Sequence, residues 1–468
     1  MYKYPRKQIS LADFGMPLGL KLDRNNRWMK KAETIPWERI EDRYAALFEN
    51  RKGNVAKPLR MALGALIIQT ERGISDAEVP LQIQETPCLQ YFCGLPGYED
   101  KLPFDSSLMV YFRKRLTPEI LGEINEMIIG KAEKRRSGKK EDPPTSCEGA
   151  EGKNEGTLIV DASCAPQNIR YPTDTSLLNE AREKLEVMVD TLHDQRDGMK
   201  PRTYRRKARR DHLKTAKKRK KTVKEIRGAV KKQLQYIRRD LKIVDNLLGK
   251  NKTLSSREQE RLHTIKTLYE QQLRMYRTRT HRVEERIVSL SQPWVRPIVR
   301  GKAKASCEFG AKLDISVVNG FTRLEHTSFD AYNEAGNLIG ILERYRVREG
   351  HYPGRVLADG IYRNRDNLSF CKEHGIRILG KPLGRPKKDA APDKKQRRND
   401  EIDRIEAERK LSHAKGSFGL GLIRTRLKQT SQTAIALSIL ALNIAQAGQF
   451  LRAFFCYLLS RRVLGFVQ

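Results

Sequence analysis

The chain has 468 residues and a strongly basic composition, with 92 lysines and arginines against 57 acidic residues and a formal net charge of +35 at pH 7. A balance this basic predicts a polyanionic partner, most simply nucleic acid. The seven cysteines form no C-x-x-C pair, which argues against a zinc ribbon and against a disulfide-stapled secreted fold. There is no signal-peptide pattern, and the longest apolar stretch, residues 434–447, is too short for a membrane span. We therefore expect a cytoplasmic protein with no membrane contact.

Residues 1–135 are predicted to form an all-α domain. Residues 1–55 are interpreted as an irregular arm with one short helix over 37–48. Pro58 then precedes an apolar run that Gly73 ends, and this pattern predicts a helix. Short helices joined by tight Gly/Ser turns are typical of a compact helical domain.

The last helix of this domain is predicted over residues 108–116 and has a basic end. It carries Arg113, Lys114 and Arg115 in succession. Such a helix suits a helix-turn-helix DNA reader, in which these three cations would contact DNA. A small packing domain with a solvated basic face is an equally good interpretation.

A polar linker over residues 136–156 separates the helical domain from the next predicted element. The linker is rich in Gly, Pro and Ser and has no large apolar side chains. Residues 157–160 form a short, mostly apolar run, and Asp161 follows it directly. We interpret it as a buried strand with an acid at its carboxyl end.

Residues 175–293 predict a long, basic, helical insertion. Apolar side chains recur at steps of three and four over 223–248 and again after the turn near residue 250, which indicates an antiparallel coiled-coil hairpin. Residues 196–300 hold 33 lysines and arginines against 10 acids, a net charge of +23. Neutralising phosphates would relieve the repulsion between these cations. A solvated coiled coil that contacts another protomer is the alternative. We favour nucleic acid because the charge is so dense, with candidate contacts at Arg205, Arg206 and Lys207.

Residues 157–174 and 294–427 are predicted to form one mixed α/β core around the insertion. Alternating patterns predict strands over 307–318 and 321–329, with Asn319-Gly320 as the hairpin turn. Helices over 337–347 and 364–374 alternate with strands over 355–359 and 376–379. A loop over 384–399 and a helix from 400 to 415 follow. This order is close to that of a ribonuclease-H-like mixed sheet. Residues 428–468 are predicted to form a C-terminal helix packed on the core.

Three acids are the candidates for chemistry. Asp161 and Asp359 each follow a short apolar strand, and a carboxylate there is costly unless it binds a cation or pairs with a base. Glu408 lies on the last core helix, four residues after Arg404 and seven before Lys415, so the three share one face. Glu408 could bind a metal while the two cations bind phosphate. Spacing alone, however, favours a surface ion pair between Arg404 and Glu408. With Glu408 included, the three carboxylates could hold two Mg²⁺ (or Mn²⁺) ions.

Several motifs resemble those of bacterial insertion-sequence transposases of the DDE type. They are VDASCAPQNIRYPTDTSLLNEARE (160–183), VLADGIYRNRDN (356–367), ILGKPLGRPKK (378–388), Arg404-x3-Glu408-x6-Lys415 followed by FGLGLI, and FDSSLMVYFRKRL (104–116). The chain departs from the pattern at Arg409, where such proteins often have Gly, and at Glu401, where a Tyr is frequent.

The resemblance implies a function and a set of roles. Asp161, Asp359 and Glu408 would be the catalytic metal ligands, and Arg404 and Lys415 would contact DNA near the cut. The basic insertion would be an accessory DNA-binding element. The segment 384–388 resembles a minor-groove hook, in which Arg385 would probe a narrow groove, and a plain flexible loop is an equally good interpretation. The protein would act as a homo-oligomer on double-stranded DNA, both element ends and target, in association with the bacterial nucleoid. A non-catalytic nucleic-acid-binding protein with a degenerate nuclease fold and a structural coiled-coil protein are the rival hypotheses.

Overall fold

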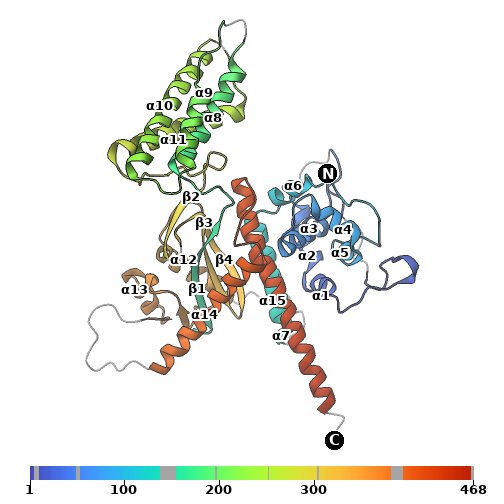
Figure 1. Cartoon of the computed structure of the whole chain (residues 1–468). Helices are drawn as coiled ribbons and strands as arrows, with labels where there is room; N and C mark the ends of the chain where they lie inside the picture. The colour runs from blue at the N-terminus through green and yellow to red at the C-terminus, as the bar shows by residue number, and fades with distance from the viewer. Residues whose placement is uncertain are drawn as a thin grey trace, which may run out of the picture. The chain divides into compact units, whose positions relative to one another are not determined.

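The structure is a computed structural model of the whole chain (Figure 1). It describes residues 1–4, 10–48, 53–137, 154–194, 198–250, 252–302, 305–380 and 394–464. The chain divides into two compact units. Unit 1 is Met1–Pro166, Lys312–Ser328 and Tyr332–Gln468, and unit 2 is Gln167–Ala311 and Phe329–Ala331. Unit 2 therefore extends beyond the predicted insertion, residues 175–293, at both ends.

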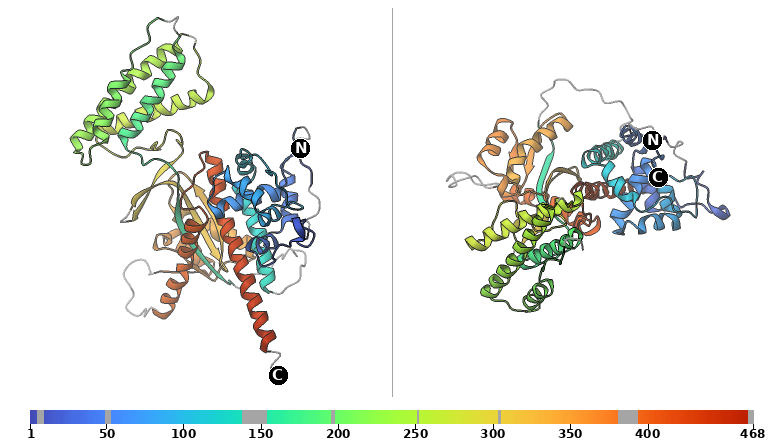
Figure 2. Two further views of the ribbon diagram at one scale, coloured as in Figure 1. Left: turned by 45° about the vertical axis from the view of Figure 1, so that its right-hand side comes forward. Right: turned by 90° about the horizontal axis from the view of Figure 1, so that it is seen from above.

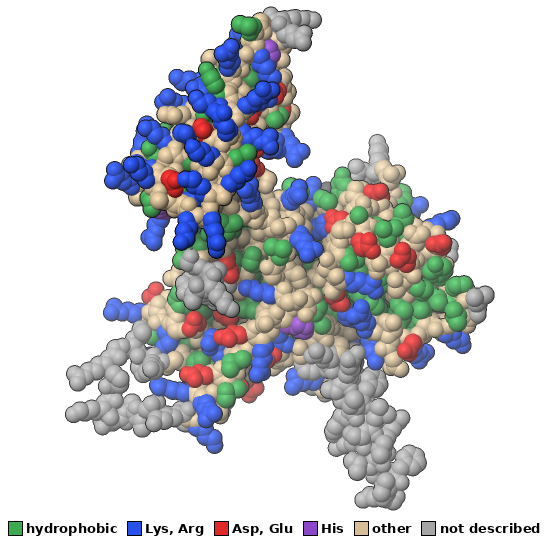
Figure 3. All heavy atoms as spheres, viewed as in Figure 1, with side chains coloured by type: hydrophobic (Ala, Val, Ile, Leu, Met, Phe, Trp, Pro, Cys, Tyr) green, Lys and Arg blue, Asp and Glu red, His purple; other side chains and the backbone are tan. Residues whose placement is uncertain are grey.

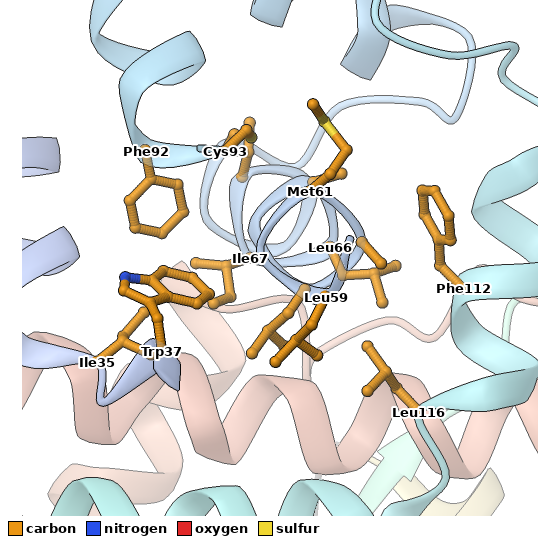
Figure 4. Close-up of a cluster of buried hydrophobic side chains, with 14 of the residues drawn as sticks. Ile35, Trp37, Leu59, Met61, Leu66, Ile67, Phe92, Cys93, Phe112 and Leu116 are labelled. Atoms are coloured by element: carbon orange, nitrogen blue, oxygen red, sulfur yellow. The ribbon is translucent and has the colours of Figure 1, made fainter. Parts of the chain in front are cut away.

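The first part of unit 1 is helical. Its elements are η1 (Pro17–Gly19), α1 (Arg27–Thr34), α2 (Trp37–Ala45), α3 (Leu59–Arg72), α4 (Glu78–Glu85), α5 (Pro87–Phe92), α6 (Leu108–Arg115) and α7 (Pro118–Ser137). Figure 4 looks along α3, with Trp37 and Phe92 on one side of this helix and Phe112 and Leu116 on the other. The helices predicted over 37–48, after Pro58 and over 108–116 are all present.

The prediction of an irregular arm is wrong for residues 27–34, which form α1. Trp28 in α1 and Trp37 at the start of α2 are 2% and 5% exposed, and both rings pack on Phe92 with centroids 5.0 and 5.6 Å away. The sequence around Trp28 is mostly charged, so apolar periodicity does not reveal the helix. Burial of the two indole rings holds it in place, because large aromatic side chains remove much apolar surface from water.

One mixed sheet of six strands lies at the centre of the α/β part. Its strands are β1 (Thr157–Pro166), β2 (Arg296–Lys302), β3 (Ala305–Val318), β4 (Phe321–Ser328), β5 (Arg355–Leu357) and β6 (Arg377–Ile378). The order is β2-β3-β1-β5-β6, with β4 also paired to β3. Strands β1, β5 and β6 are parallel, whereas β3 is antiparallel to β2 and to β4. The mixed α/β class predicted from the sequence is confirmed.

The β3–β4 hairpin turns where the sequence indicates. Asn319 and Gly320 have φ angles of 53° and 82°, and Val318 pairs with Phe321 across the turn. Positive φ at both central positions is the type I′ geometry that matches the twist of the flanking strands.

Further helices of unit 1 follow the sheet strands along the chain. They are η3 (Glu334–Asn337), α12 (Leu338–Glu349), η4 (Gly360–Tyr362), α13 (Arg365–Glu373), α14 (Lys394–Ser417) and α15 (Lys428–Leu464). Helix α14 begins six residues before the predicted start and runs past Gly416. Helix α15 packs on α7 and β4, as Figure 1 shows, and its buried Asn443 accepts a hydrogen bond from the Thr322 N–H (2.9 Å). No helix in the described ranges is long and apolar enough to cross a membrane.

Unit 2 contains α8 (Asp174–Leu192), α9 (Arg205–Ala216), α10 (Val223–Leu248) and α11 (Ser256–Thr278), which lie side by side in both views of Figure 2. Helices α10 and α11 are the predicted hairpin pair, and capping boxes begin both of them, at Thr222 and at Ser255. The pair does not stand alone, because α8 and α9 also pack on α10. Residues from α8, α10 and α11 share one apolar core. The insertion is therefore a helical bundle.

Candidate active site

The strand register places Asp161 and Asp359 at the same level of two adjacent strands. Ile159 in β1 pairs with Leu357 in β5, and each aspartate stands two residues beyond its member of that pair. Side chains alternate between the faces of a sheet, so residues two apart share a face. Strand β1 continues to residue 166, so Asp161 lies within the strand and not at its end as predicted. Strand β5 does end just before Asp359, whose carboxylate accepts a hydrogen bond from the Gly360 N–H (2.7 Å).

The charges of the other two candidate acids, Asp359 and Glu408, and of Arg404 all act on Asp161. It is half-buried, and this burial is the main reason why its pKa lies above the ordinary value. The Ala162 N–H, which donates to it (2.9 Å), and the charge of Arg404 counteract the rise in pKa. The charges of Glu408 and Asp359 add to it. The fold thus brings residues from β1, β5 and α14 into electrostatic contact, although they are up to 247 positions apart in the sequence.

Helix α14 is attached to the sheet by a carboxylate that the sequence analysis overlooked. Asp400 is 1% exposed and accepts hydrogen bonds from Arg355 of β5 (2.8 Å) and from both terminal nitrogens of Arg377 of β6 (2.6 and 2.8 Å). The Arg377 guanidinium holds the pKa of Asp400 below its usual range. Arg355 also donates to Asp403 (2.7 Å). These hydrogen bonds fix the position of α14, the helix that carries Glu408, relative to strands β5 and β6.

We expect Asp400→Ala to destabilise unit 1 by about 2 kcal/mol, because it removes charge-assisted hydrogen bonds from two arginine side chains that are 32% and 42% exposed. The measurement is the free energy of unfolding in urea. Glu401→Ala is the matched control, since Glu401 is the neighbouring acid on α14 and is exposed. Equal unfolding free energies for the two variants would contradict the anchoring role.

Arg404 and Glu408 form the ion pair that their spacing indicates, with 3.1 Å between nitrogen and oxygen. The Glu408 side chain is 54% exposed and that of Arg404 is 27% exposed. The structure therefore contains the surface ion pair that the spacing of these two residues favours. The exposed carboxylate of Glu408 is nevertheless near enough to Asp161 for its charge to raise the pKa of that residue.

The FGLGLI segment closes α14 and attaches its end to β1. The N–H groups of Phe418 and Leu420 both donate to the carbonyl of Ala414, and that of Ile423 donates to the carbonyl of Pro166 (2.8 Å). At Gly421 a Cβ atom would lie 2.7 Å from the Lys415 carbonyl oxygen, so no larger residue fits without a shift. Lys415 itself is half-buried at this end of the helix.

A second acid that the sequence analysis did not identify is buried within the sheet. Asp314 of β3 is fully buried and accepts hydrogen bonds from Tyr332 (2.8 Å) and Asn337 (2.6 Å). Burial and the charges of Asp314, Asp161 and Asp359, among others, raise the pKa of Tyr362, which is 1% exposed. The charges of Asp314 and of the two candidate aspartates thus act on the same tyrosine. An acid between Leu313 and Ile315 in the predicted strand was the available signal.

The three candidate acids offer oxygen ligands only, which is the donor set that Mg²⁺ and Mn²⁺ prefer. Within the described ranges, no group of three or more His, Cys, Asp or Glu residues has the spacing to hold a metal ion. Asp359 and Glu408 are exposed and Asp161 is half-buried. The donor chemistry thus fits a hard divalent cation, and ligation would need the exposed side chains to turn inward.

The basic residues of α6 do not form one surface. Arg113 is 5% exposed and donates to Asp76 (2.9 Å) and Gln69 (2.6 Å), so its predicted DNA contact is wrong. It holds α6 against α3, and Asp76 compensates its charge. Lys114 is exposed, and the guanidinium of Arg115 lies 4.9 Å from the ring centre of Phe48.

The candidate DNA contacts of the insertion also differ from one another. Arg205 is paired with Asp190 (2.6 Å), whereas Arg206 and Lys207 are exposed on α9. Arg385 lies outside the described residues.

Two family models match parts of the chain. One, described as Transposase DDE domain, covers residues 356–445, and the other, described as Transposase domain (DUF772), covers residues 17–115. The uncharacterized protein ORF8 in nfe locus of Rhizobium meliloti is 28% identical over 183 residues, which are 39% of this chain and 80% of that protein. No solved structure matches the chain. The resemblance to transposases of the DDE type that the motifs indicate is confirmed by these matches.

Proposed function

We propose that the protein is a DNA transposase that cleaves and rejoins phosphodiesters at the ends of an insertion sequence. The observation that carries this proposal is the strand register of Asp161 and Asp359 together with the charge of Glu408 acting on Asp161. The match of residues 356–445 to a transposase DDE domain includes two of these three acids. The strand order β2-β3-β1-β5-β6, with β4 also paired to β3 and with a parallel half and an antiparallel half, supports a ribonuclease-H-like core.

Asp161, Asp359 and Glu408 would hold the divalent ions of a two-metal site, Mg²⁺ or Mn²⁺. When bound, these ions supply an activated oxygen nucleophile and charge stabilisation at the leaving oxygen. Asp161 is the most buried of the three, and its burial in the sheet suits a ligand of fixed position. Glu408 is carried by α14, whose position depends on Asp400.

Arg404 and Lys415 would hold the scissile phosphate. A guanidinium presents a planar fork that fits two phosphate oxygens, and an ammonium adds a compact point charge. Both residues lie on α14 near the edge of its buried face. Their charges neutralise the phosphate while the fixed strands align the reactants, and these are the two main contributions that a protein makes to phosphoryl transfer.

The bond changes require no further co-reactant. Water adds to the phosphorus, and the bond to the 3′ oxygen breaks, which leaves a 3′-hydroxyl and a 5′-phosphate. That hydroxyl then attacks a phosphodiester of the target, and one P–O bond replaces another. We also propose that the protein acts as a homo-oligomer, because two element ends must be held together, and that it works on DNA in the bacterial cytoplasm.

The test is a nicking assay with the full chain and end-labelled DNA that carries the inverted repeats flanking the gene. We expect strand cleavage at the repeat ends with Mg²⁺ or Mn²⁺, no cleavage after chelation with EDTA, and DNA binding under both conditions. Binding without cleavage under any metal would favour the alternative, a non-catalytic nucleic-acid-binding protein with a degenerate nuclease fold. Cleavage that persists in EDTA would contradict metal-dependent chemistry.

A further inference from the structure

One face of helix α9 carries a row of cations. Their spacing of three and four residues along the helix places them on a single face, and they line one open hollow with Leu213 between them. Figure 3 shows lysine and arginine side chains spread over the visible face of unit 2. We call the following exposed residues the α9 cationic face: Arg206, Arg209, Arg210, Lys214 and Lys217.

The structure gives these five cations no ion pair among the residues it describes. The partly exposed acids next to α9 pair with other cations. Asp190 pairs with Arg205 and Lys200, and Glu225 pairs with Lys218.

Asp211, the one acid within α9, points away from this face. It accepts a hydrogen bond from Tyr236 of α10 (3.1 Å) and lies 3.6 Å from Lys232. The described part of the chain thus provides no counter-charge for the α9 cationic face.

The opposite side of α9 is held against α10. Ala208 is fully buried there, and its carbonyl accepts a hydrogen bond from Gln233 (3.4 Å). The guanidinium of Arg239 of α10 also lies 4.6 Å from the ring centre of Tyr204, the residue that precedes α9. The α9 cationic face is consequently presented outward on a supported helix rather than on a loop.

Cations one turn apart on a helix repel, so five of them with no partner destabilise the free bundle. A polyanion removes that repulsion and releases its condensed counterions on binding. The 12 residues of α9 span about 18 Å, a length over which double-stranded DNA presents about ten phosphates on its two strands. Apart from Leu213, the hollow is lined by cations only, and cations neutralise phosphates whatever the base sequence.

We propose that the α9 cationic face binds the phosphate backbone of double-stranded DNA without sequence preference. The choice of DNA over other polyanions rests on the proposed transposase function, whereas the location of the surface rests on burial and pairing alone. The face would hold DNA while the candidate active site acts, so it adds affinity and leaves the chemistry to unit 1.

The experiment compares two full-length variants that lose the same charge. The first replaces the α9 cationic face, as R206Q/R209Q/R210Q/K214Q/K217Q, because glutamine keeps the helix propensity. The control replaces exposed cations of α11 and the segments on either side of it that do not belong to that face, as K250Q/R257Q/R274Q/R277Q/R282Q. Far-ultraviolet circular dichroism verifies that both variants stay folded. Kd for a random-sequence duplex is then measured over a range of salt concentrations.

We expect the α9 variant to lower the slope of log Kd against log salt by about 4, because each phosphate that a cation neutralises contributes roughly 0.9 to that slope. The control should change the slope much less. Equal changes in the two variants would overturn the proposal, since only net charge would then matter. Greater loss of binding to single-stranded RNA or to anionic lipid vesicles than to the duplex would also overturn it. Failure of the wild type to bind duplex DNA at all would instead count against the proposed function.

Discussion

Asp161→Asn, Asp359→Asn and Glu408→Gln should each reduce metal-dependent nicking by about a thousandfold or more. Each change removes one anionic oxygen ligand while the side chain keeps its size, and loss of a single preorganised charge-stabilising group commonly costs about that much in rate. DNA binding should be unchanged, because none of the three carboxylates attracts phosphate. The measurements are the rate of strand cleavage at saturating DNA and the Kd for the same duplex.

Glu401→Gln is the matched control for the three amide variants. Glu401 is an exposed acid on α14, as Glu408 is, and the chain has it at a position where related transposases often have Tyr. We expect it to nick at the wild-type rate. If Glu408→Gln nicks as fast as Glu401→Gln, then Glu408 is only the surface partner of Arg404, and the third ligand must be sought elsewhere.

The elements of the candidate site could be predicted where local pattern decides the structure. Short apolar runs before Asp161 and Asp359 identified the two strands, and the spacing of Arg404 and Glu408 identified their common helix face. These predictions depend on neighbours only a few residues apart. The same reasoning placed the Asn319-Gly320 hairpin, because both residues tolerate positive φ.

The other features could not be predicted from the sequence, because they depend on residues that are distant along the chain. Arg113 has the sequence context of a solvated basic run, and only the fold shows that Asp76, 37 residues away, neutralises it. Asp400 is one acid among several in a charged stretch, and its two arginine partners come from strands 23 and 45 positions earlier. The periodicity of α10 predicted an apolar stripe but not which helix covers it, since α8 and α11 carry similar stripes.

Asp240 is expected to make the helical bundle of unit 2 less stable as the pH rises. It lies in α10, is fully buried, and its two carboxyl oxygens have no hydrogen-bond partner among the described residues. Burial is the main cause that raises its pKa to about 7, and the charge of Glu186 on α8 adds to this rise. The charges of Arg182, Arg239 and Arg205, in that order, counteract it without cancelling it.

The sign of the pH effect follows from proton binding. Between the ordinary carboxyl pKa and a folded pKa of about 7, the folded bundle holds a proton that the unfolded chain releases. Stability should therefore decline as the pH rises through this window and level off above it. Asp240→Asn should remove the contribution of this residue to that decline and stabilise the bundle at about pH 8 by on the order of 2 to 4 kcal/mol, because each pKa unit corresponds to about 1.4 kcal/mol.

Hydrogen exchange of α10 peptides in the full chain, converted to opening free energies at about pH 5 and about pH 8, measures this difference. Asp245→Asn is the control, because Asp245 lies on the same helix but is half exposed and paired with Lys266 at the surface. We expect the control to keep the wild-type pH dependence. A wild-type bundle whose opening free energy increases between these pH values would mean that Asp240 is ionised in the folded state, with Arg182 or Arg239 as its counter-ion. Its burial would then be a stabilising feature of the α8–α10 interface instead of a cost.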